Sequence, residues 1–211
     1  MPAKNAVKLY SENGFYHIYN RGAGKNEIFL SEQDYGVFLH YLKDYLSPPR
    51  ILTPEEIKNM VVPHLLKNYY QEIDLLAFCL MPNHFHLLLK QKQDRSIVGF
   101  MRSLSTRYSC YFNKNHQRPG HLYQGIYKGI LIRNEEYLWW LSRYIHKNPQ
   151  ELLSSGESLE NYPYSSYSAY LGKTKLDWVN SGFLLASIKN YRDFVENPEE
   201  KEIDKDITLD A

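Results

Sequence analysis

The segment MPNHFHLLLK, residues 81–90, joins a turn signal to a strongly apolar run. Pro82 and Asn83 are typical of turns, and the leucines that follow indicate a buried β-strand. Side chains alternate between the two faces of a strand, so His84 and His86 should point to the same side of the sheet. Single histidines on strands are commonly satisfied core residues, but a pair on one face can also bind a divalent metal. Because two ligands do not complete such a site, a third donor has to come from elsewhere.

Outward from this segment, apolar residues recur with the periods of strands and helices. Ser31 followed by Asp34 resembles a capping box at a helix start, and Asn148 and Pro149 follow the last periodic residue of another helix. In chain order we predict a strand at 14–22, a helix at 31–46, a helical insertion at 47–72, strands at 73–80 and 84–90, a helix at 96–113, a strand within 120–133 and a helix at 134–147.

The predicted order of elements places a β-hairpin between two βα segments, which is typical of the split βαβ, ferredoxin-like arrangement. We therefore predict an α+β fold with an antiparallel sheet, an arrangement in which helices pack on one face and the other face can be left for a ligand. Residues 1–172 would form the catalytic domain, interrupted by the helical insertion at 47–72. Residues 173–211 would form a C-terminal extension that ends in a flexible acidic tail.

Charge is unevenly distributed along the chain, although the net charge of its 211 residues is only +1. Residues 192–211 contain 8 acidic and 3 basic side chains, whereas residues 90–147 contain 11 basic and 3 acidic ones. A basic region of this kind attracts phosphate backbones, and some of the 19 tyrosines could stack on unpaired bases. Ordinary surface charge and core packing are the alternatives. The candidate nucleic-acid contacts are Arg102, Arg107, Lys114, Arg118, Lys128 and Arg133 for phosphates, with Tyr123 and Tyr127 for stacking.

The sequence has no run of 18 apolar residues and no apolar stretch of signal-peptide length near its N-terminus. These features predict a soluble, unexported protein with no membrane partner. Cys79 and Cys110 lack the spacing of a metal site, so we interpret both as small core residues in a reducing cytoplasm. The expected location is therefore cytoplasmic.

The segment NEEYLWWLSRYIHKNP, residues 134–149, offers a third donor for the histidine pair. Tyr137, Tyr144 and Asn148 lie on one helical stripe, and the last two are one turn apart. If this stripe faces the histidines, a phenol and an amide oxygen would reach a bound metal together. The alternative is that the tyrosines belong to the core and that Asn148 only ends the helix.

Three motifs in this order, PNHFHLLL, GHLYQGIYKGILI and YIHKNP, resemble the single-tyrosine HUH transposases. The likeness is strongest to the REP-associated tyrosine transposases (RAYT), which are related to the insertion sequence 200-like group, and it extends over about residues 14–171. The resemblance implies that His84 and His86 bind Mg²⁺ or Mn²⁺ and that Tyr144 is the nucleophile. It also implies that Asn148 is the third ligand, at a position where insertion-sequence relatives often have glutamine. Tyr137, two turns nearer the helix start, is the competing nucleophile.

The activity implied by this resemblance is metal-dependent cleavage and rejoining of single-stranded DNA through a covalent 5′-phosphotyrosine. The expected target is a DNA hairpin formed by a palindromic repeat. Among relatives, both a monomer and a homodimer with the tyrosine helix supplied in trans are known, so a homodimer is one expected partner state. Two other functions remain open: a domesticated protein that binds DNA or RNA hairpins without cutting them, and a metal-dependent hydrolase that activates water.

Overall fold

A computed structural model describes residues 10–51, 53–59 and 67–197. Within them, four strands form one sheet in the order β2-β3-β1-β4, and every neighbouring pair is antiparallel. This arrangement confirms the predicted α+β fold and its split βαβ order. The strands are β1 (Phe15–Arg21), β2 (Ile73–Met81), β3 (His84–Gln91) and β4 (Lys128–Ile132).

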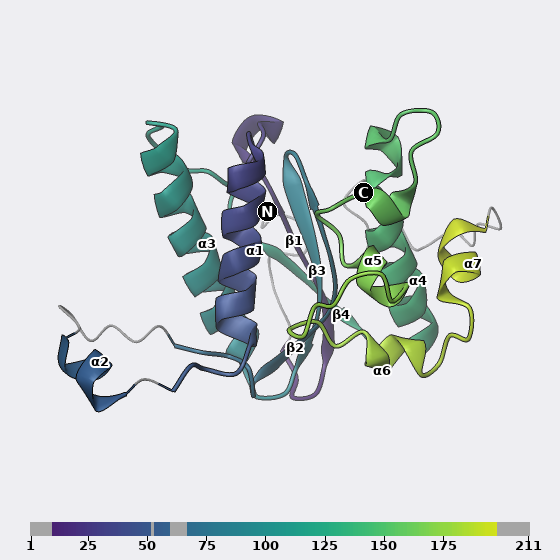
Figure 1. The fold of residues 1–211 in the computed structure, drawn as a ribbon, viewed down its shortest axis with the longest axis horizontal. Helices are drawn as coiled ribbons and strands as arrows, with labels where there is room; N and C mark the ends of the chain where they lie inside the picture. Colours follow the sequence, from purple (N-terminus) through teal and green to yellow (C-terminus); the bar gives the residue numbers. More distant parts are fainter. Residues whose placement is uncertain (1–9, 52, 60–66, 198–211) are drawn as a thin grey trace, which may run out of the picture.

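Two long helices, α1 (Glu32–Leu46) and α3 (Ser96–Asn115), cover one face of the sheet (Figure 1). They pack against the strand side chains that alternate toward them, such as Ile18 of β1. The predicted capping box is confirmed: the Ser31 hydroxyl accepts a hydrogen bond from the Asp34 amide, and the Asp34 carboxylate accepts one from the Ser31 amide. The start of α1 is therefore set by local sequence.

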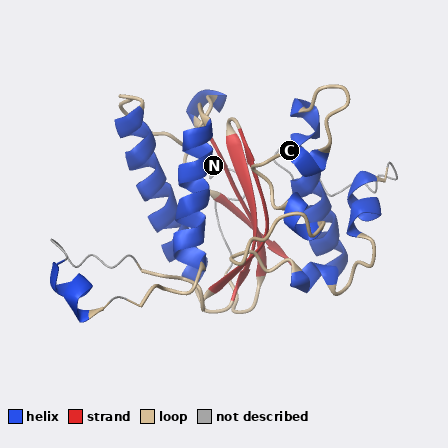
Figure 2. Ribbon diagram, in the orientation of Figure 1, coloured by secondary structure: helices blue, strands red, loops and turns tan. Residues whose placement is uncertain are grey.

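The opposite face of the sheet is covered by α4 (Glu135–Lys147) and by shorter helical segments that follow it (Figures 1 and 2). Such a sheet can leave its second face for a ligand, but in this structure α4 packs on that face. Leu138, Leu141 and Ile145 form a buried stripe on α4, and burying them requires the helix to pack on β2 and β3. Any ligand site on this face has to lie at the edge of α4 or between α4 and the sheet.

The remaining elements are short, and α2 lies away from the sheet in Figure 1. The acidic tail after residue 197 and part of the predicted insertion lie outside the described residues. Within 10–51, 53–59 and 67–197, no helix has the length and apolar character needed to cross a bilayer. These elements are η1 (Ala23–Lys25), α2 (Pro54–Asn59), η2 (Asn148–Leu152), η3 (Leu159–Asn161), α5 (Tyr167–Tyr170), α6 (Gly182–Leu185) and α7 (Tyr191–Glu196).

The two cysteines differ in burial. Cys79 lies on β2 and is fully buried under α4, as predicted. Cys110 is exposed on α3, so its assignment to the core was wrong. The apolar stripe of α3 passes through Tyr108 and Phe112. Cys110, midway between them in the sequence, is therefore on the solvent side of the helix.

Candidate active site

Both histidines of the HFH segment lie on the face of the sheet that α4 covers, which confirms the predicted shared side. Phe85, between them, packs into the core on the α1 and α3 side. The imidazole centroids of His84 and His86 are 5.0 Å apart, and the rings are nearly perpendicular. Across the sheet, His84 pairs with Arg21 and His86 pairs with Tyr19 on β1. The histidines therefore lie where β3 begins and β1 ends.

The last turns of α4 bring a phenol and an amide to these histidines. The Tyr144 ring lies 5.4 Å from the His86 ring, centroid to centroid, in an edge-on arrangement. The Asn148 side-chain oxygen lies 3.2 Å from His84 Nε2. Tyr137, the alternative nucleophile, is exposed on the first turns of α4. The rotation of α4 thus separates two tyrosines that the helical stripe had grouped together.

The hydrogen bonds of Asn83 fix which nitrogen of His84 carries the proton. The Asn83 amide nitrogen donates to the Lys25 carbonyl, which leaves its oxygen to accept from His84 Nδ1 at 2.6 Å. In a neutral imidazole with hydrogen on Nδ1, Nε2 has only a lone pair. His84 Nε2 and the Asn148 oxygen are then two acceptors facing each other at 3.2 Å. A cation between them would turn this repulsion into attraction.

His86 presents a similar nitrogen. Its ring is fully buried, and its Nδ1 lies 2.8 Å from Nε2 of His17, on β1. Its own Nε2 is buried and has no hydrogen-bond partner among the described residues. Burial is the largest of the effects that lower the pKa of His86 well below its ordinary value, and its two histidine neighbours and Arg21 lower it further. A neutral imidazole with a free lone pair is the form that binds metals.

We call His17, His84, His86, Tyr144 and Asn148 the histidine site. Two imidazole nitrogens and one amide oxygen form a donor set that suits a divalent cation, and positions remain for a substrate. Among the described residues, no three His, Cys, Asp or Glu side chains are grouped so that they could hold a metal. The third donor of the histidine site is an amide oxygen, which lies outside those four residue types. The histidine site can therefore fit a metal, although only two of its three proposed donors come from those four residue types.

Two cationic side chains belong to strand positions beside the histidine site. Arg21 occupies the position opposite His84, and its Nε is buried without a hydrogen-bond partner in the described part of the chain. Lys128 lies opposite Tyr19, which in turn lies opposite His86, so these three residues form one row across the sheet. Sequence analysis proposed Lys128 and missed Arg21. The period-two pattern of β1 would have placed Arg21 on the same face as His17.

The other candidate DNA contacts are spread over the surface. Arg107 stacks on the Tyr41 ring at 3.7 Å and pairs with Asp44 at 3.0 Å. Tyr123 and Tyr127 are each only 8% exposed, which limits stacking on a base. The Arg118 guanidinium donates to a backbone carbonyl in the following loop. The remaining candidates are exposed and lie on α3 or close to α4: Arg102, Lys114 and Arg133.

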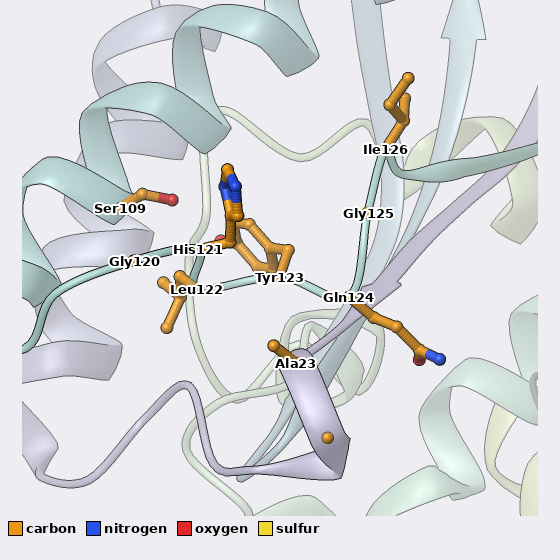
Figure 3. Close-up of a pocket in the computed structure, with 10 residues that line it drawn as sticks. Ala23, Ser109, Gly120, His121, Leu122, Tyr123, Gln124, Gly125 and Ile126 are labelled. Atoms are coloured by element: carbon orange, nitrogen blue, oxygen red, sulfur yellow. The ribbon is translucent and has the colours of Figure 1, made fainter.

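A hollow of about 640 Å³ adjoins the end of β1. Figure 3 shows the loop at residues 120–126 passing between Ser109 on α3 and Ala23 on η1. The backbone N–H of Gln124, in this loop, donates a hydrogen bond to the Arg21 carbonyl at 2.9 Å. Arg21 ends β1 and lies opposite His84 on β3, so the hollow is next to the end of β1 that pairs with His84. A second hollow, of about 530 Å³, shares Tyr123, Gly125 and Ile126 of this loop with the first.

A separate cluster of buried polar side chains surrounds His146, in the last turn of α4. His146 is fully buried, with Nδ1 2.8 Å from the Tyr191 hydroxyl and Nε2 2.8 Å from the Ser166 hydroxyl. The Tyr191 hydroxyl in turn donates to Ser142. Burial lowers the pKa of His146 to about 3. We call Ser142, His146, Ser166 and Tyr191 the anchor cluster, because it ties the C-terminal segments to α4.

Comparisons with solved structures define the class of fold. The structure of a REP-associated tyrosine transposase bound to a REP hairpin superimposes with a TM-score of 0.54 over 82% of this chain and 89% of that one, at 15% sequence identity. A putative transposase from Deinococcus radiodurans matches 67% of this chain and 95% of its own, at 16% identity and a TM-score of 0.40. This chain therefore shares the fold of the hairpin-bound transposase.

The family model described as "Transposase IS200 like" matches residues 55–148. This segment contains β2, β3, α3, β4 and α4, and with them four of the five residues of the histidine site. No curated protein is similar enough in sequence to count as a match. The match over residues 55–148 and the shared fold both support the resemblance to the IS200-like transposases that the sequence motifs indicate.

Proposed function

We propose that this protein cleaves and rejoins single-stranded DNA through a covalent bond between Tyr144 and a 5′-phosphate. One observation carries the proposal: the Tyr144 ring lies 5.4 Å from the His86 ring, whose neighbour His84 has its Nε2 3.2 Å from the Asn148 oxygen. All of these groups come from one chain, so the site needs no second copy. Whether the protein also forms a homodimer stays a prediction, as does its cytoplasmic location.

His84, His86 and Asn148 would hold a divalent cation, with Mg²⁺ or Mn²⁺ as the expected ion. Such a cation polarises a nonbridging phosphate oxygen and stabilises the charge that develops during attack. The lowered pKa of His86 keeps its ring neutral, which suits a ligand and does not suit a general acid. Arg21 supports the proposal that a phosphodiester binds here, because a guanidinium beside the histidine site can pair with the phosphate.

In the proposed step, the Tyr144 oxygen forms a bond to phosphorus while the bond from phosphorus to the 3′-oxygen breaks. The phenol loses a proton and the leaving 3′-oxygen gains one, so the step produces a 5′-phosphotyrosine and a free 3′-hydroxyl. The phosphotyrosine retains the energy of the broken ester, and attack by a 3′-hydroxyl can reverse the step and join strands. No external energy source is needed.

We infer a DNA hairpin as the substrate. The fold is shared with a transposase whose solved structure contains a REP hairpin, and residues 90–147 carry a strong excess of basic side chains. Exposed Arg102, Lys114 and Arg133 would contact phosphates. The hollow between Ala23 and Gln124 lies beside the end of β1 and would receive nucleotides of the bound hairpin.

The test is incubation of the protein with end-labelled single-stranded DNA from the flanks of its own gene, folded into hairpins, in the presence of Mn²⁺. We expect an adduct that survives denaturation and that disappears in Tyr144→Phe. Tyr137→Phe is the matched control, because it removes a hydroxyl from the same helix at an exposed position. It should form the adduct normally.

Three outcomes would contradict the proposal, each in a different way. If DNA is cleaved with no adduct, and cleavage persists in Tyr144→Phe, the protein is a hydrolase that activates water. Hairpin binding without cleavage under any metal condition would indicate a protein that only binds. An adduct that is lost in Tyr137→Phe and kept in Tyr144→Phe would move the nucleophile to the start of α4.

A further inference from the structure

We propose that His17 is a positioning residue that sets the tautomer of His86 and so keeps His86 Nε2 available to a cation; this inference rests on the proposed function. His17 lies on β1, outside the segment that matches the family model. Its Nε2 is 2.8 Å from His86 Nδ1, and both rings are fully buried. A hydrogen bond between these two nitrogens contains one proton. Whether His17 Nε2 or His86 Nδ1 carries that proton decides what His86 can bind.

Two arrangements of that proton are chemically possible. If His17 Nε2 carries the hydrogen, neutral His86 must carry its own hydrogen on Nε2, which would bury a donor without an acceptor. If His86 Nδ1 carries the hydrogen and His17 Nε2 accepts it, His86 Nε2 is a bare lone pair. Only the second arrangement lets His86 act as a ligand. The bond to His17 would therefore select the binding form before any metal arrives.

The packing around His17 holds its ring in the orientation that this role requires. The ring lies 4.8 Å from Tyr19 and 5.1 Å from His86, centroid to centroid, and it stacks nearly parallel to His86. The edge of Tyr144 closes the same space at 6.3 Å. These contacts restrict rotation of the His17 ring and keep its Nε2 within hydrogen-bond distance of His86 Nδ1.

Asn83 does for His84 what we assign to His17 for His86. The Asn83 oxygen accepts from His84 Nδ1 at 2.6 Å, and this leaves His84 Nε2 facing Asn148. Each imidazole of the pair thus has its Nδ1 bonded to a side chain; Nε2 of His84 faces Asn148, and Nε2 of His86 is buried without a partner among the described residues. Such bonds to the far nitrogen orient metal-binding histidines and raise their basicity. The same pattern on two rings is the strongest argument that the contact of His17 is not incidental packing.

The test compares His17→Phe, which cannot accept a hydrogen bond, with His17→Gln, whose side-chain oxygen can. Mn²⁺ alone is titrated into each full-length variant, and free Mn²⁺ is measured by electron paramagnetic resonance. We expect His17→Phe to lower the affinity by about 10- to 100-fold and His17→Gln to restore most of it. Unchanged binding of hairpin DNA and an unchanged melting temperature would show that the fold is intact.

A second measurement reports the tautomer directly and does not depend on the metal. In metal-free protein labelled with ¹⁵N-histidine, the His86 signals are assigned by their loss in His86→Ala. We expect the Nδ1–H form in the wild type and a shift toward the Nε2–H form in His17→Phe. Wild-type Mn²⁺ affinity in His17→Phe, or an Nε2–H form in the wild type, would overturn the inference.

Failure of the proposed function would look different. If His86→Ala bound Mn²⁺ as tightly as the wild type, the metal would not bind at the histidine site at all. The ¹⁵N spectra would still decide whether His17 sets the tautomer of His86. If His86→Ala lost affinity and His17→Phe did not, the metal site would stand and the role of His17 would be wrong.

Discussion

The histidine site and the anchor cluster both contain buried histidines that contact or belong to α4, and they differ in how completely the histidine nitrogens are bonded. In the anchor cluster, both nitrogens of His146 lie 2.8 Å from hydroxyl groups. In the histidine site, His86 Nε2 has no partner among the described residues. A buried polar atom without a partner costs about 1–3 kcal/mol. The comparison teaches that a fully bonded buried histidine holds structure, whereas one with an unbonded buried nitrogen beside other possible ligands is suited to bind a cation.

The largest expected difference between the two groups is in DNA cleavage. His86→Ala should reduce adduct formation by more than the roughly 10- to 100-fold that is typical for residues behind a metal ligand, because it removes a ligand itself. His146→Gln should keep adduct formation, since its side chain contacts no proposed reacting group. Rates of adduct formation at saturating Mn²⁺ measure both. Equal losses in the two variants would break the distinction.

Stability in the presence of metal should separate the groups next. A cation that binds only the folded state at 100 times its dissociation constant adds about 2.7 kcal/mol to the free energy of unfolding. We expect this gain in the wild type and in Ser166→Ala, which removes a hydroxyl of the anchor cluster, and no gain in His86→Ala. Urea unfolding with and without Mn²⁺ measures it. A gain that persists in His86→Ala would place the metal elsewhere.

Acid should destabilise the protein through the anchor cluster. The pKa of His146 is about 3 in the folded chain, against an ordinary value of about 6.5, so its contribution to stability is complete above pH 6.5 and is lost as the pH falls toward 3. Between pH 7 and pH 5 this loss is about 2 kcal/mol. The lowered pKa of His86 acts in the same direction in metal-free protein.

The measurement is urea unfolding of metal-free protein between pH 7 and pH 5. His146→Gln has no group that titrates in this range at residue 146, so its free energy of unfolding should depend less steeply on pH. An identical pH dependence in the wild type and in this variant would show that His146 is not held neutral by its surroundings.

The smallest expected effect is on the salt dependence of DNA affinity, which should depend on neither the histidine site nor the anchor cluster. Lys114→Ala removes an exposed cation from the end of α3 and should reduce the slope of log affinity against log salt concentration by about 1. His86→Ala and His146→Gln should leave this slope unchanged. Fluorescence anisotropy with a labelled hairpin at several salt concentrations gives the slope. A changed slope in either histidine variant would mean that those residues shape the DNA surface.

Local sequence signals predicted most of the fold. The turn at Pro82 and Asn83, the alternation of β3 and the capping box at Ser31 each depend on neighbouring residues only, and the structure confirms them. The sequence did not predict that α4 covers the second face of the sheet, because this contact depends on how the helix packs in the folded chain. The same packing separates Tyr144 from Tyr137, since the buried stripe of α4 sets its rotation.

The candidate site was predictable where residues are close in sequence or share a stripe, and less so where strand register brings them together. His84 and His86 follow from one strand. His17 and His86 are 69 residues apart, and only the antiparallel pairing of β1 with β3 places them in contact. Arg21 was missed for the same reason. Arg107 was proposed as a phosphate contact, but no sequence pattern indicates its stacking on Tyr41 and its pairing with Asp44.

The most direct measurement is a crystal structure of the protein grown with Mn²⁺, with anomalous diffraction used to locate the metal. We predict one strong peak at bonding distance from His84 Nε2, His86 Nε2 and the Asn148 oxygen, with the Tyr144 hydroxyl directed toward it. A peak bound elsewhere, with His86 Nε2 still lacking a partner, would contradict the conclusion that these side chains form a metal site for phosphodiester chemistry.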